Sequence, residues 1–237
     1  MEHDFWHNKW DINQIGFHLN YIHPLLKRNL KLFQLDEALK EQNEQKREER
    51  EQDSHRPKIF VPLCGKTLDI GYLLAQGYSV VAIELSEIAV QEVFASLELQ
   101  PNNQPIISEW VGGKLYQTKN LQVFVGDFFA LTQEDLGEIA LVYDRAALVA
   151  LPESMRKDYS SQLEKITQQA PQLLITLDYD QTVAGGPPFA VSSDEVECLY
   201  AANYPIQLLE EDDIIEQEPR FKAKGLTSFY QRAYRLK

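Results

Sequence analysis

Cysteine is scarce in this chain, which contains only Cys64 and Cys198 among its 237 residues. The two thiols lie far apart, and neither has a cysteine or histidine beside it at a metal-ligand spacing. A disulfide framework and a structural zinc site are therefore excluded as organising features. We expect both thiols to be free, as is usual in a reducing compartment.

Long apolar runs are also missing. No stretch approaches the roughly 18 apolar residues that a membrane-spanning helix needs. The first residues, Met1 to Asp4, are neither basic nor followed by an apolar segment, so no signal peptide is predicted. We therefore expect no membrane association and a cytoplasmic location.

Basic charge is low: 23 Lys and Arg face 36 Asp and Glu, which gives a net charge of −13. A protein that binds the phosphate backbone needs a basic face, so nucleic acid is not an expected partner. The rest of the composition, 44% apolar and 25% charged, is that of an ordinary globular protein. The length is compatible with one or two domains, and no Pro/Gly/Ser-rich linker or repeat interrupts the chain.

One segment, Lys40–Arg56, contains no large apolar residue. It holds five basic and six acidic side chains, with pairs such as Glu44 and Arg47 at helical spacing. This charged insertion is predicted to be a solvated helix or a mobile loop; the alternative is a helix that binds a partner.

Beyond that insertion, apolar runs alternate with amphipathic stretches, which is the pattern of a mostly parallel sheet with helices on both faces. The predicted strands are Lys58–Leu63, Ser79–Leu85, Leu121–Gly126, Ile139–Asp144 and Leu173–Asp178. The predicted helices are Leu68–Ala75, Glu87–Leu97, Glu153–Gln168 and a helix that begins at Ser192, where Glu195 completes a capping-box pattern.

Two further pairings are predicted to be antiparallel. Ile206–Leu209 and Ser228–Leu236 are strand-like and show no helix between them, so we expect a hairpin that closes the sheet. The pair Gly112-Gly113, between Glu109–Val111 and Lys114–Gln117, predicts a second, smaller hairpin.

The turn after the first predicted strand contains Gly65-Lys66-Thr67 but no other glycine. A nucleotide-phosphate loop would place a glycine where this chain has Phe60, and a dinucleotide site would need G-x-G-x-x-G. Both phosphate-binding classes are therefore disfavoured.

Polar residues follow the other predicted strands, at the edge where doubly wound sheets bind ligands. Glu84 lies 19 positions after Gly65, where Rossmann-like folds place a carboxylate against ribose; the alternative is an exposed residue or a helix cap. Asp127 and Phe128 would bind and flank an adenine, or form an ordinary turn. Arg145 would clamp an anionic ligand, or form an ion pair with Asp144.

The first 20 residues are rich in aromatic and histidine side chains. Such a segment either packs on a sheet edge or folds over the site as a lid.

Several segments together match one known family. They are FWHNKWDINQIGFH, IFVPLCGKTLDIGYLLAQGYSVVAIELSEIAV, GDFFAL, VYDRAALVALP, LLITLDYD, GGPPF and PRFKAKGL. With these segments the chain closely resembles bacterial thiopurine S-methyltransferases, which use S-adenosyl-L-methionine. The resemblance implies a class I methyltransferase fold: one Rossmann-like α/β domain over residues 1–237, with a seven-stranded mixed sheet, an antiparallel last strand and an N-terminal aromatic lid segment at residues 1–22. It also implies a monomer that methylates the sulfur of thiopurines or other aromatic thiols.

The resemblance assigns roles to individual residues. The implied cofactor-binding residues are Trp6, Trp10, Leu63, Glu84, Asp127, Phe128 and Arg145. The implied acceptor-binding residues are Phe17, Arg145 and Arg220, the two arginines acting as stabilisers of an anionic acceptor. Neither a covalent nucleophile nor a metal is implied, because a thiolate attacks a sulfonium methyl group once the two are aligned.

Alternatives remain at the level of the sequence. The physiological acceptor is a thiol or a selenium or tellurium species, and a non-catalytic cofactor-binding protein is a third reading. Cys64 is a buried small residue or a nucleophile, and Cys198 is expected in the core. His18 packs or faces the acceptor, and Gly185–Phe189 closes the acceptor pocket or forms a plain turn.

Overall fold

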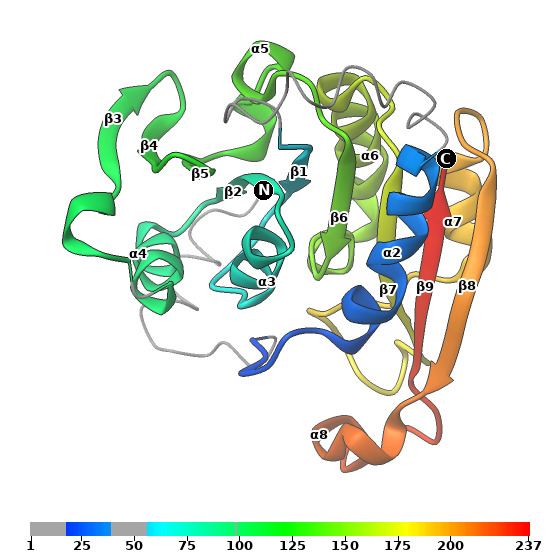
Figure 1. Ribbon diagram of the computed structural model, residues 1–237. Helices are drawn as coiled ribbons and strands as arrows, with labels where there is room; N and C mark the ends of the chain where they lie inside the picture. Colours follow the sequence, from blue (N-terminus) through cyan, green and yellow to red (C-terminus); the bar gives the residue numbers. More distant parts are fainter. Residues whose placement is uncertain (1–17, 39–55, 98) are drawn as a thin grey trace.

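The computed structural model describes residues 18–38, 56–97 and 99–237, and its strands form one mixed sheet with helices on both faces (Figure 1). The strands are β1 (Lys58–Val61), β2 (Ser79–Glu84), β3 (Ile106–Trp110), β4 (Gly113–Gln117), β5 (Leu121–Gly126), β6 (Leu141–Arg145), β7 (Gln172–Asp178), β8 (Ile206–Asp213) and β9 (Tyr230–Leu236). The helices are α2 (Pro24–Ala38), α3 (Asp69–Ala75), α4 (Glu87–Ser96), α5 (Gln133–Leu136), α6 (Glu153–Thr167), α7 (Ser193–Tyr200) and α8 (Pro219–Lys222).

The strand order is β3-β4-β5-β2-β1-β6-β7-β9-β8. The five strands from β5 to β7 are mutually parallel, whereas β9 is antiparallel to both of its neighbours. The expected antiparallel last strand is thus confirmed. The expected number of seven strands is wrong for the whole sheet, because the hairpin β3–β4 adds two strands beside β5.

Two hydrophobic layers fill the space between the sheet and its helices. One face packs against α2, α3 and α4, and the opposite face packs against α6 and α7 (Figure 1). Successive residues of β1 supply both layers, since Phe60 points to the second layer while Ile59 and Val61 point to the first. A strand buried on both faces needs a continuous apolar run, and such runs allowed these strands to be predicted from the sequence.

Local signals set several helix starts. Ser86 caps α4 by accepting a hydrogen bond from the backbone N–H of Ala89, and Ser192 caps α7 by accepting one from Glu195. The predicted start of α7 at Ser192 is confirmed by this bond. Pro24 occupies the first turn of α2, where its missing N–H leaves no intrahelical bond unmade.

The hairpin β3–β4 follows the Gly112-Gly113 prediction. Gly113 pairs with Gly126 of β5, and a Cβ on Gly113 would lie 2.2 Å from the carbonyl oxygen of Val125. With a φ of +148°, this position also favours glycine over residues that carry a side chain. The glycine pair therefore lets the hairpin approach β5 closely.

Three expectations differ from the structure. The segment between β8 and β9 is not free of helix, because it contains α8 and a short 3₁₀ turn at Ile215–Gln217. Cys198 is exposed on α7 and does not lie in the core. Helix α2 lies between the lid segment and the charged insertion, and no element was predicted there.

Two expectations fall largely outside the described residues. The insertion Lys40–Arg56 is described only at Arg56, and the lid segment 1–22 only from His18 onward. None of the helices within residues 18–38, 56–97 and 99–237 combines the length and the apolar character that crossing a membrane requires.

Candidate active site

The sheet changes direction of winding between β1 and β6. From β1 the chain proceeds outward through β2 to β5, then returns to place β6 on the other side of β1. Ligands of doubly wound sheets bind beyond the carboxyl ends of the strands at such a switch point. Leu63, Glu84 and Arg145 lie at or just after the ends of β1, β2 and β6, and all three line one cavity.

The cavity extends from these strand ends toward the C-terminal part of the chain. Its walls come from residues 18–24, the turn after β1, the ends of β2, β6 and β7, the loop before α7, and the region of α8 and β9. Segments far apart in the sequence therefore meet at one site.

The turn after β1 has an unusual backbone. Leu63 has a φ of +43° and Gly65 a φ of +54°, and Ala146, in the turn after β6, has a φ of +64°. Non-glycine residues rarely adopt this left-handed conformation, which costs roughly 1–3 kcal/mol and tends to occur at functional sites. Both strained turns line the cavity.

Glu84 fixes the shape of the first turn. Its Oε2 accepts a hydrogen bond from the backbone N–H of Gly65 at 2.8 Å, and its Oε1 accepts one from Ser86 at 3.0 Å. Burial raises the pKa of Glu84, whereas the backbone N–H donors oppose that shift. Each carboxylate oxygen has a further lone pair, so Glu84 can accept hydroxyl hydrogen bonds from a ligand while it holds the turn.

Arg145 ends β6 on the side that faces α2. Burial lowers the pKa values of His18 and His23, and the charge of Arg145 lowers both further, after that of Lys66 in the case of His18. The neighbouring Asp144 is fully buried, with hydrogen bonds from the hydroxyl of Tyr159 at 2.7 Å and the backbone N–H of Leu148 at 3.2 Å. The alternative of an Asp144–Arg145 ion pair is therefore wrong, because adjacent strand residues point to opposite faces.

Asp69, the first residue of α3, joins three elements beneath the cavity. This buried carboxylate accepts one hydrogen bond from the backbone N–H of His23 at 2.8 Å and another from the hydroxyl of Tyr143 at 2.9 Å. Tyr143 lies two residues before Arg145 on β6. The contacts fix the start of α2 relative to the strand that carries Arg145.

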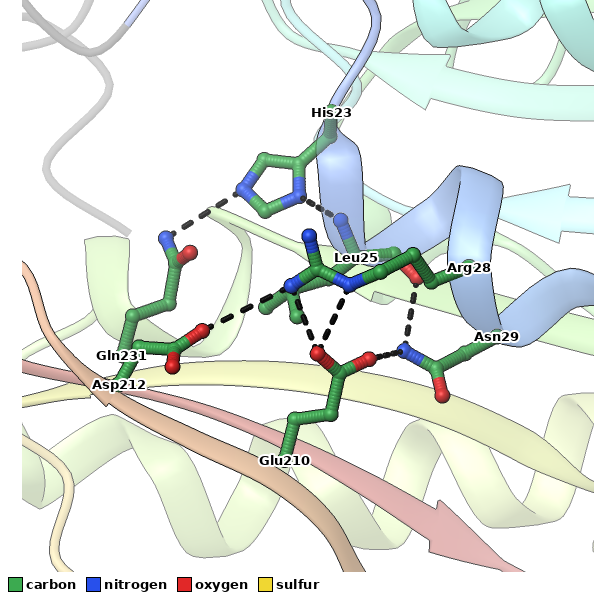
Figure 2. A network of polar contacts seen from close by, with 7 residues as sticks. All are labelled: His23, Leu25, Arg28, Asn29, Glu210, Asp212 and Gln231. Atoms are coloured by element: carbon green, nitrogen blue, oxygen red, sulfur yellow. Dashed lines mark hydrogen bonds and ion pairs between the residues drawn. The ribbon is translucent and has the colours of Figure 1, made fainter.

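Figure 2 shows how α2 is joined to β8 and β9. His23 Nδ1 accepts from the backbone N–H of Leu25 at 3.2 Å, and its Nε2 lies 3.3 Å from the side-chain nitrogen of Gln231. Farther along α2, Arg28 and Asn29 both bind Glu210 of β8. Burial lowers the pKa of His23 to about 3, so this cavity-lining imidazole is neutral at physiological pH.

The far side of the cavity is aromatic. Phe221 of α8 and Phe229 line it with ring centroids 4.5 Å apart, and Tyr179 stacks on Phe229 at 5.0 Å. Arg220 lines the same wall, as do Pro187 and Pro188. The Gly185–Phe189 loop thus borders the cavity, as predicted, and this part of the site suits a flat ring.

Two predicted site residues, Asp127 and Phe128, do not line the cavity, and three others lie outside the described ranges. Asp127 caps a 3₁₀ turn by accepting from the backbone N–H of Phe129 at 3.0 Å. Phe128 is fully buried with its ring against Tyr159, so an adenine contact by this residue has to use its backbone. Trp6, Trp10 and Phe17 lie outside the described residues.

Cys64 lies in the cavity wall, but its chemistry is not that of a nucleophile. Burial and the neighbouring charge of Glu84 raise the pKa of its thiol well above the usual value. The thiol therefore stays protonated, which supports the interpretation of a buried small residue.

Sequence reasoning missed several cavity residues, including His23, Glu218 and Gln231. His23 had a detectable signal, because it precedes Pro24 and an amphipathic run and so occupies a helix N-cap position. Glu218 and Gln231 had none, since their approach to the cavity depends on how α8 and β9 fold back over β7.

Comparison with known proteins identifies the family. The thiopurine S-methyltransferase family model matches residues 1–237. The chain belongs to the thiopurine S-methyltransferase family. A thiopurine S-methyltransferase of Teredinibacter turnerae is 43% identical over 210 residues, covering 89% of this chain and 87% of that protein. One from Pseudomonas fluorescens strain SBW25 is 41% identical over 238 residues, covering 100% and 99%.

Solved structures agree with the fold expected for this family. A SAM-dependent methyltransferase of Methanosarcina mazei superposes with a TM-score of 0.53 at 12% identity, covering 78% of this chain and 93% of that one. The fold is the class I, Rossmann-like methyltransferase fold. Thiopurine S-methyltransferases take the methyl group from S-adenosyl-L-methionine and transfer it to sulfur, and this family member is an enzyme of that class.

Proposed function

We propose that this cavity holds S-adenosyl-L-methionine and an aromatic thiol side by side, and that the enzyme methylates the sulfur of thiopurines or related thiols. The observation that supports this most strongly is the composition of the cavity wall. One cavity is lined by the turn at Leu63 and Gly65 and by Glu84, and the same cavity is lined by Arg145, Arg220 and the rings of Phe221 and Phe229.

Glu84 and the turn at Leu63 suit the donor. We assign the ribose hydroxyls to the free lone pairs of Glu84 and the methionine part to the backbone of Leu63 and Gly65. The family resemblance adds Trp6, Trp10, Asp127, Phe128 and Arg145 to the cofactor-binding residues. When bound, the cofactor supplies an electrophilic methyl group on a sulfonium sulfur.

Arg145 and Arg220 suit the acceptor. A guanidinium stabilises a thiolate or another delocalised anion, and orientation of two bound reactants supplies roughly 7–11 kcal/mol of barrier reduction. Phe221 and Phe229 favour a flat aromatic acceptor over a small selenium or tellurium oxyanion. Phe17 is assigned to the acceptor pocket from the resemblance.

We further propose that the protein is a single domain, a monomer and a cytoplasmic enzyme that acts on a small molecule. The continuous sheet supports the single domain within the described residues. Sedimentation velocity of the full chain tests the monomer, and a mass of twice 27.3 kDa would contradict it.

The test of the donor site is calorimetric titration of S-adenosylhomocysteine into the wild type, Glu84→Ala and the surface control Glu197→Ala. We expect Glu84→Ala to lose about 1.5–3 kcal/mol of binding free energy, the usual contribution of hydrogen bonds to a charged group. Turnover of labelled cofactor with mercaptopurine, selenite and tellurite then identifies the acceptor class. Unchanged affinity in folded Glu84→Ala would reject the ribose role, and turnover of the oxyanions alone would reject the thiol acceptor.

A further inference from the structure

Two opposite charges line the acceptor side of the cavity without pairing. Glu218 and Arg220 are two residues apart at the start of α8, and both border the cavity. Across the described ranges, no hydrogen-bond donor reaches the Glu218 carboxylate, and Arg220 forms no ion pair. The Arg220 guanidinium instead lies over the Phe221 ring, 5.1 Å from its centroid.

The surroundings of Glu218 make this arrangement unusual. The side chain is half-buried, and burial raises the pKa of Glu218, while the charge of Arg220 opposes that shift. Water in the cavity can donate to this carboxylate, so a bound ring that displaces the water leaves the carboxylate unsatisfied unless the ring supplies a donor in its place. By contrast, the nearby Glu216 is exposed, forms an ion pair with Lys222 at 2.5 Å, and does not line the cavity.

The aromatic walls define what kind of donor can reach Glu218. A flat ring held near Phe221 and Phe229 presents only its edge groups to the charged side chains. On a nitrogen heterocycle that carries a thiol, the edge offers both an anionic or polarised sulfur and a ring N–H. These two groups are complementary to an arginine and a carboxylate on the same wall.

We propose that Glu218 is a specificity-determining residue, which accepts a hydrogen bond from a ring N–H of the acceptor while Arg145 or Arg220 faces its anionic part. The enzyme therefore prefers heteroaromatic thiols with a ring N–H to carbocyclic thiols, and it disfavours aromatic thiols that carry a carboxylate. This inference rests on the proposed function, since it concerns the acceptor half of the same cavity.

The preference among these acceptors follows from the free-energy cost of leaving the Glu218 carboxylate without a donor or of placing a second negative charge near it. A carbocyclic thiol leaves Glu218 without a donor, and a site built for a hydrogen bond rejects analogues that lack it. An acceptor with its own carboxylate places two like charges in one cavity, which adds repulsion.

The experiment compares kcat/KM for mercaptopurine, para-nitrothiophenol and thiosalicylate. The proteins are the wild type, Glu218→Gln, Glu218→Met and the control Glu216→Met. For Glu218→Met we expect about a tenfold loss with mercaptopurine and a gain with both para-nitrothiophenol and thiosalicylate, because the variant lacks the carboxylate that the first of these leaves without a donor and that repels the second. Glu218→Gln keeps a neutral acceptor oxygen and should lie between Glu218→Met and the wild type. Glu216→Met should match the wild type with all three acceptors.

Calorimetry with S-adenosylhomocysteine separates an effect on the acceptor from misfolding or from weaker binding of the cofactor. Unchanged cofactor affinity in both Glu218 variants shows that the protein is folded and that the effect lies on the acceptor side. Equal losses for mercaptopurine and para-nitrothiophenol, or no loss for either, would overturn the role of Glu218 while leaving the proposed function intact. A wild type that binds the cofactor but methylates none of the three thiols would overturn both.

Discussion

Among single residues, the two cavity arginines are the clearest candidates for a charge effect on the acceptor. Arg145 is held on β6, beneath α2, whereas Arg220 lies on the exposed side of α8. Asp144 accepts from Tyr159 and Leu148 and forms no ion pair with Arg145, and the anion clamp is the role of Arg145 that we test.

The first prediction concerns these arginines. Arg145→Met and Arg220→Met keep much of the apolar stem and remove the charge, so kcat/KM should fall mainly for thiols that bind as anions. Arg145→Met should be the more severe, because β6 places it beside the donor end of the cavity. Steady-state kinetics with ionised and neutral acceptors of similar shape measures the difference. Lys222→Met on the same short helix is the control, and a matched loss for both acceptor types would argue against the clamp.

Asp144 gives a prediction about stability. Its burial raises the pKa to about 6 from 3.8, so the folded state binds a proton more tightly than the unfolded chain does. The ionised form therefore destabilises the fold above about pH 6, by about 3 kcal/mol, and this penalty disappears as the pH falls toward 3.8. Between about pH 7.5 and about pH 5, the wild type should regain about 1.4 kcal/mol relative to Asp144→Asn. Urea unfolding of both proteins at the two pH values measures the change, and a constant difference would contradict the raised pKa.

Among secondary-structure elements, α2 has the most consequences for the site. The residue that precedes it, His23, lines the cavity, and its later residues Arg28 and Asn29 bind Glu210 of β8. The Arg28–Glu210 pair, 2.6 Å apart, is half-exposed on the arginine side, so it contributes at most about 1 kcal/mol. The orientation of α2 therefore depends mainly on Leu25, Leu26 and Leu30 in the core, with the polar contacts fixing its register.

His23 leads to the opposite prediction: it makes the protein less stable as the pH falls, whereas Asp144 makes it more stable. Its folded pKa of about 3 lies below the ordinary 6.5, so the unfolded chain takes up a proton that the folded state refuses. Stability is lost as the pH falls below 6.5, by about 2 kcal/mol between about pH 7.5 and about pH 5. His23→Asn keeps an N-cap acceptor for Leu25 and removes the titration, so it should lose about 2 kcal/mol less than the wild type over that range. Denaturant unfolding at both pH values measures the free energy of unfolding of the wild type, His23→Asn and the reference Asp144→Asn. If the free energies of wild type and His23→Asn change with pH in parallel, the imidazole of His23 is not buried and neutral.

At the scale of the whole molecule, the parallel strands of the sheet were easier to predict from the sequence than the rest of the fold. Strands such as β2 are buried on both faces and appear as uninterrupted apolar runs, and Ser192 marked its helix through a local cap. The hairpin β3–β4 followed from two glycines alone. The donor end of the cavity could also be predicted, because Glu84 and Arg145 lie at the ends of predicted strands, and the family resemblance added Leu63.

The acceptor end was harder to predict for a physical reason. Glu218, Arg220 and Gln231 reach the cavity only because the segment after β8 forms α8 and then returns as β9 beside β7. These contacts join segments far apart in the sequence, so no local hydrophobic periodicity indicates them, and no helix was predicted between β8 and β9. Cys198 was misplaced because a short amphipathic helix has few residues to define which face is buried.

The position of β9 yields the prediction for the whole molecule. Tyr230–Leu236 pairs with β7 on one side and β8 on the other, so its removal deprives both neighbours of a strand. A variant that lacks residues 230–237 should fail to fold cooperatively, as measured by circular dichroism and thermal melting. Deletion of Lys237 alone leaves the β9 pairing intact and should retain a wild-type melt. A cooperative melt in the longer deletion would show that the sheet closes without β9.

The same strand order has a consequence for biosynthesis. A ribosome makes β7 first, then β8, and only later the strand that lies between them, so β8 waits without its neighbour while the nascent chain is extended. Until β9 arrives, the exposed backbone edges of both strands are open to pairing with other chains. Newly made protein should therefore depend on chaperones most during this interval, and slowing translation between the codons for β8 and β9 should lower its soluble yield.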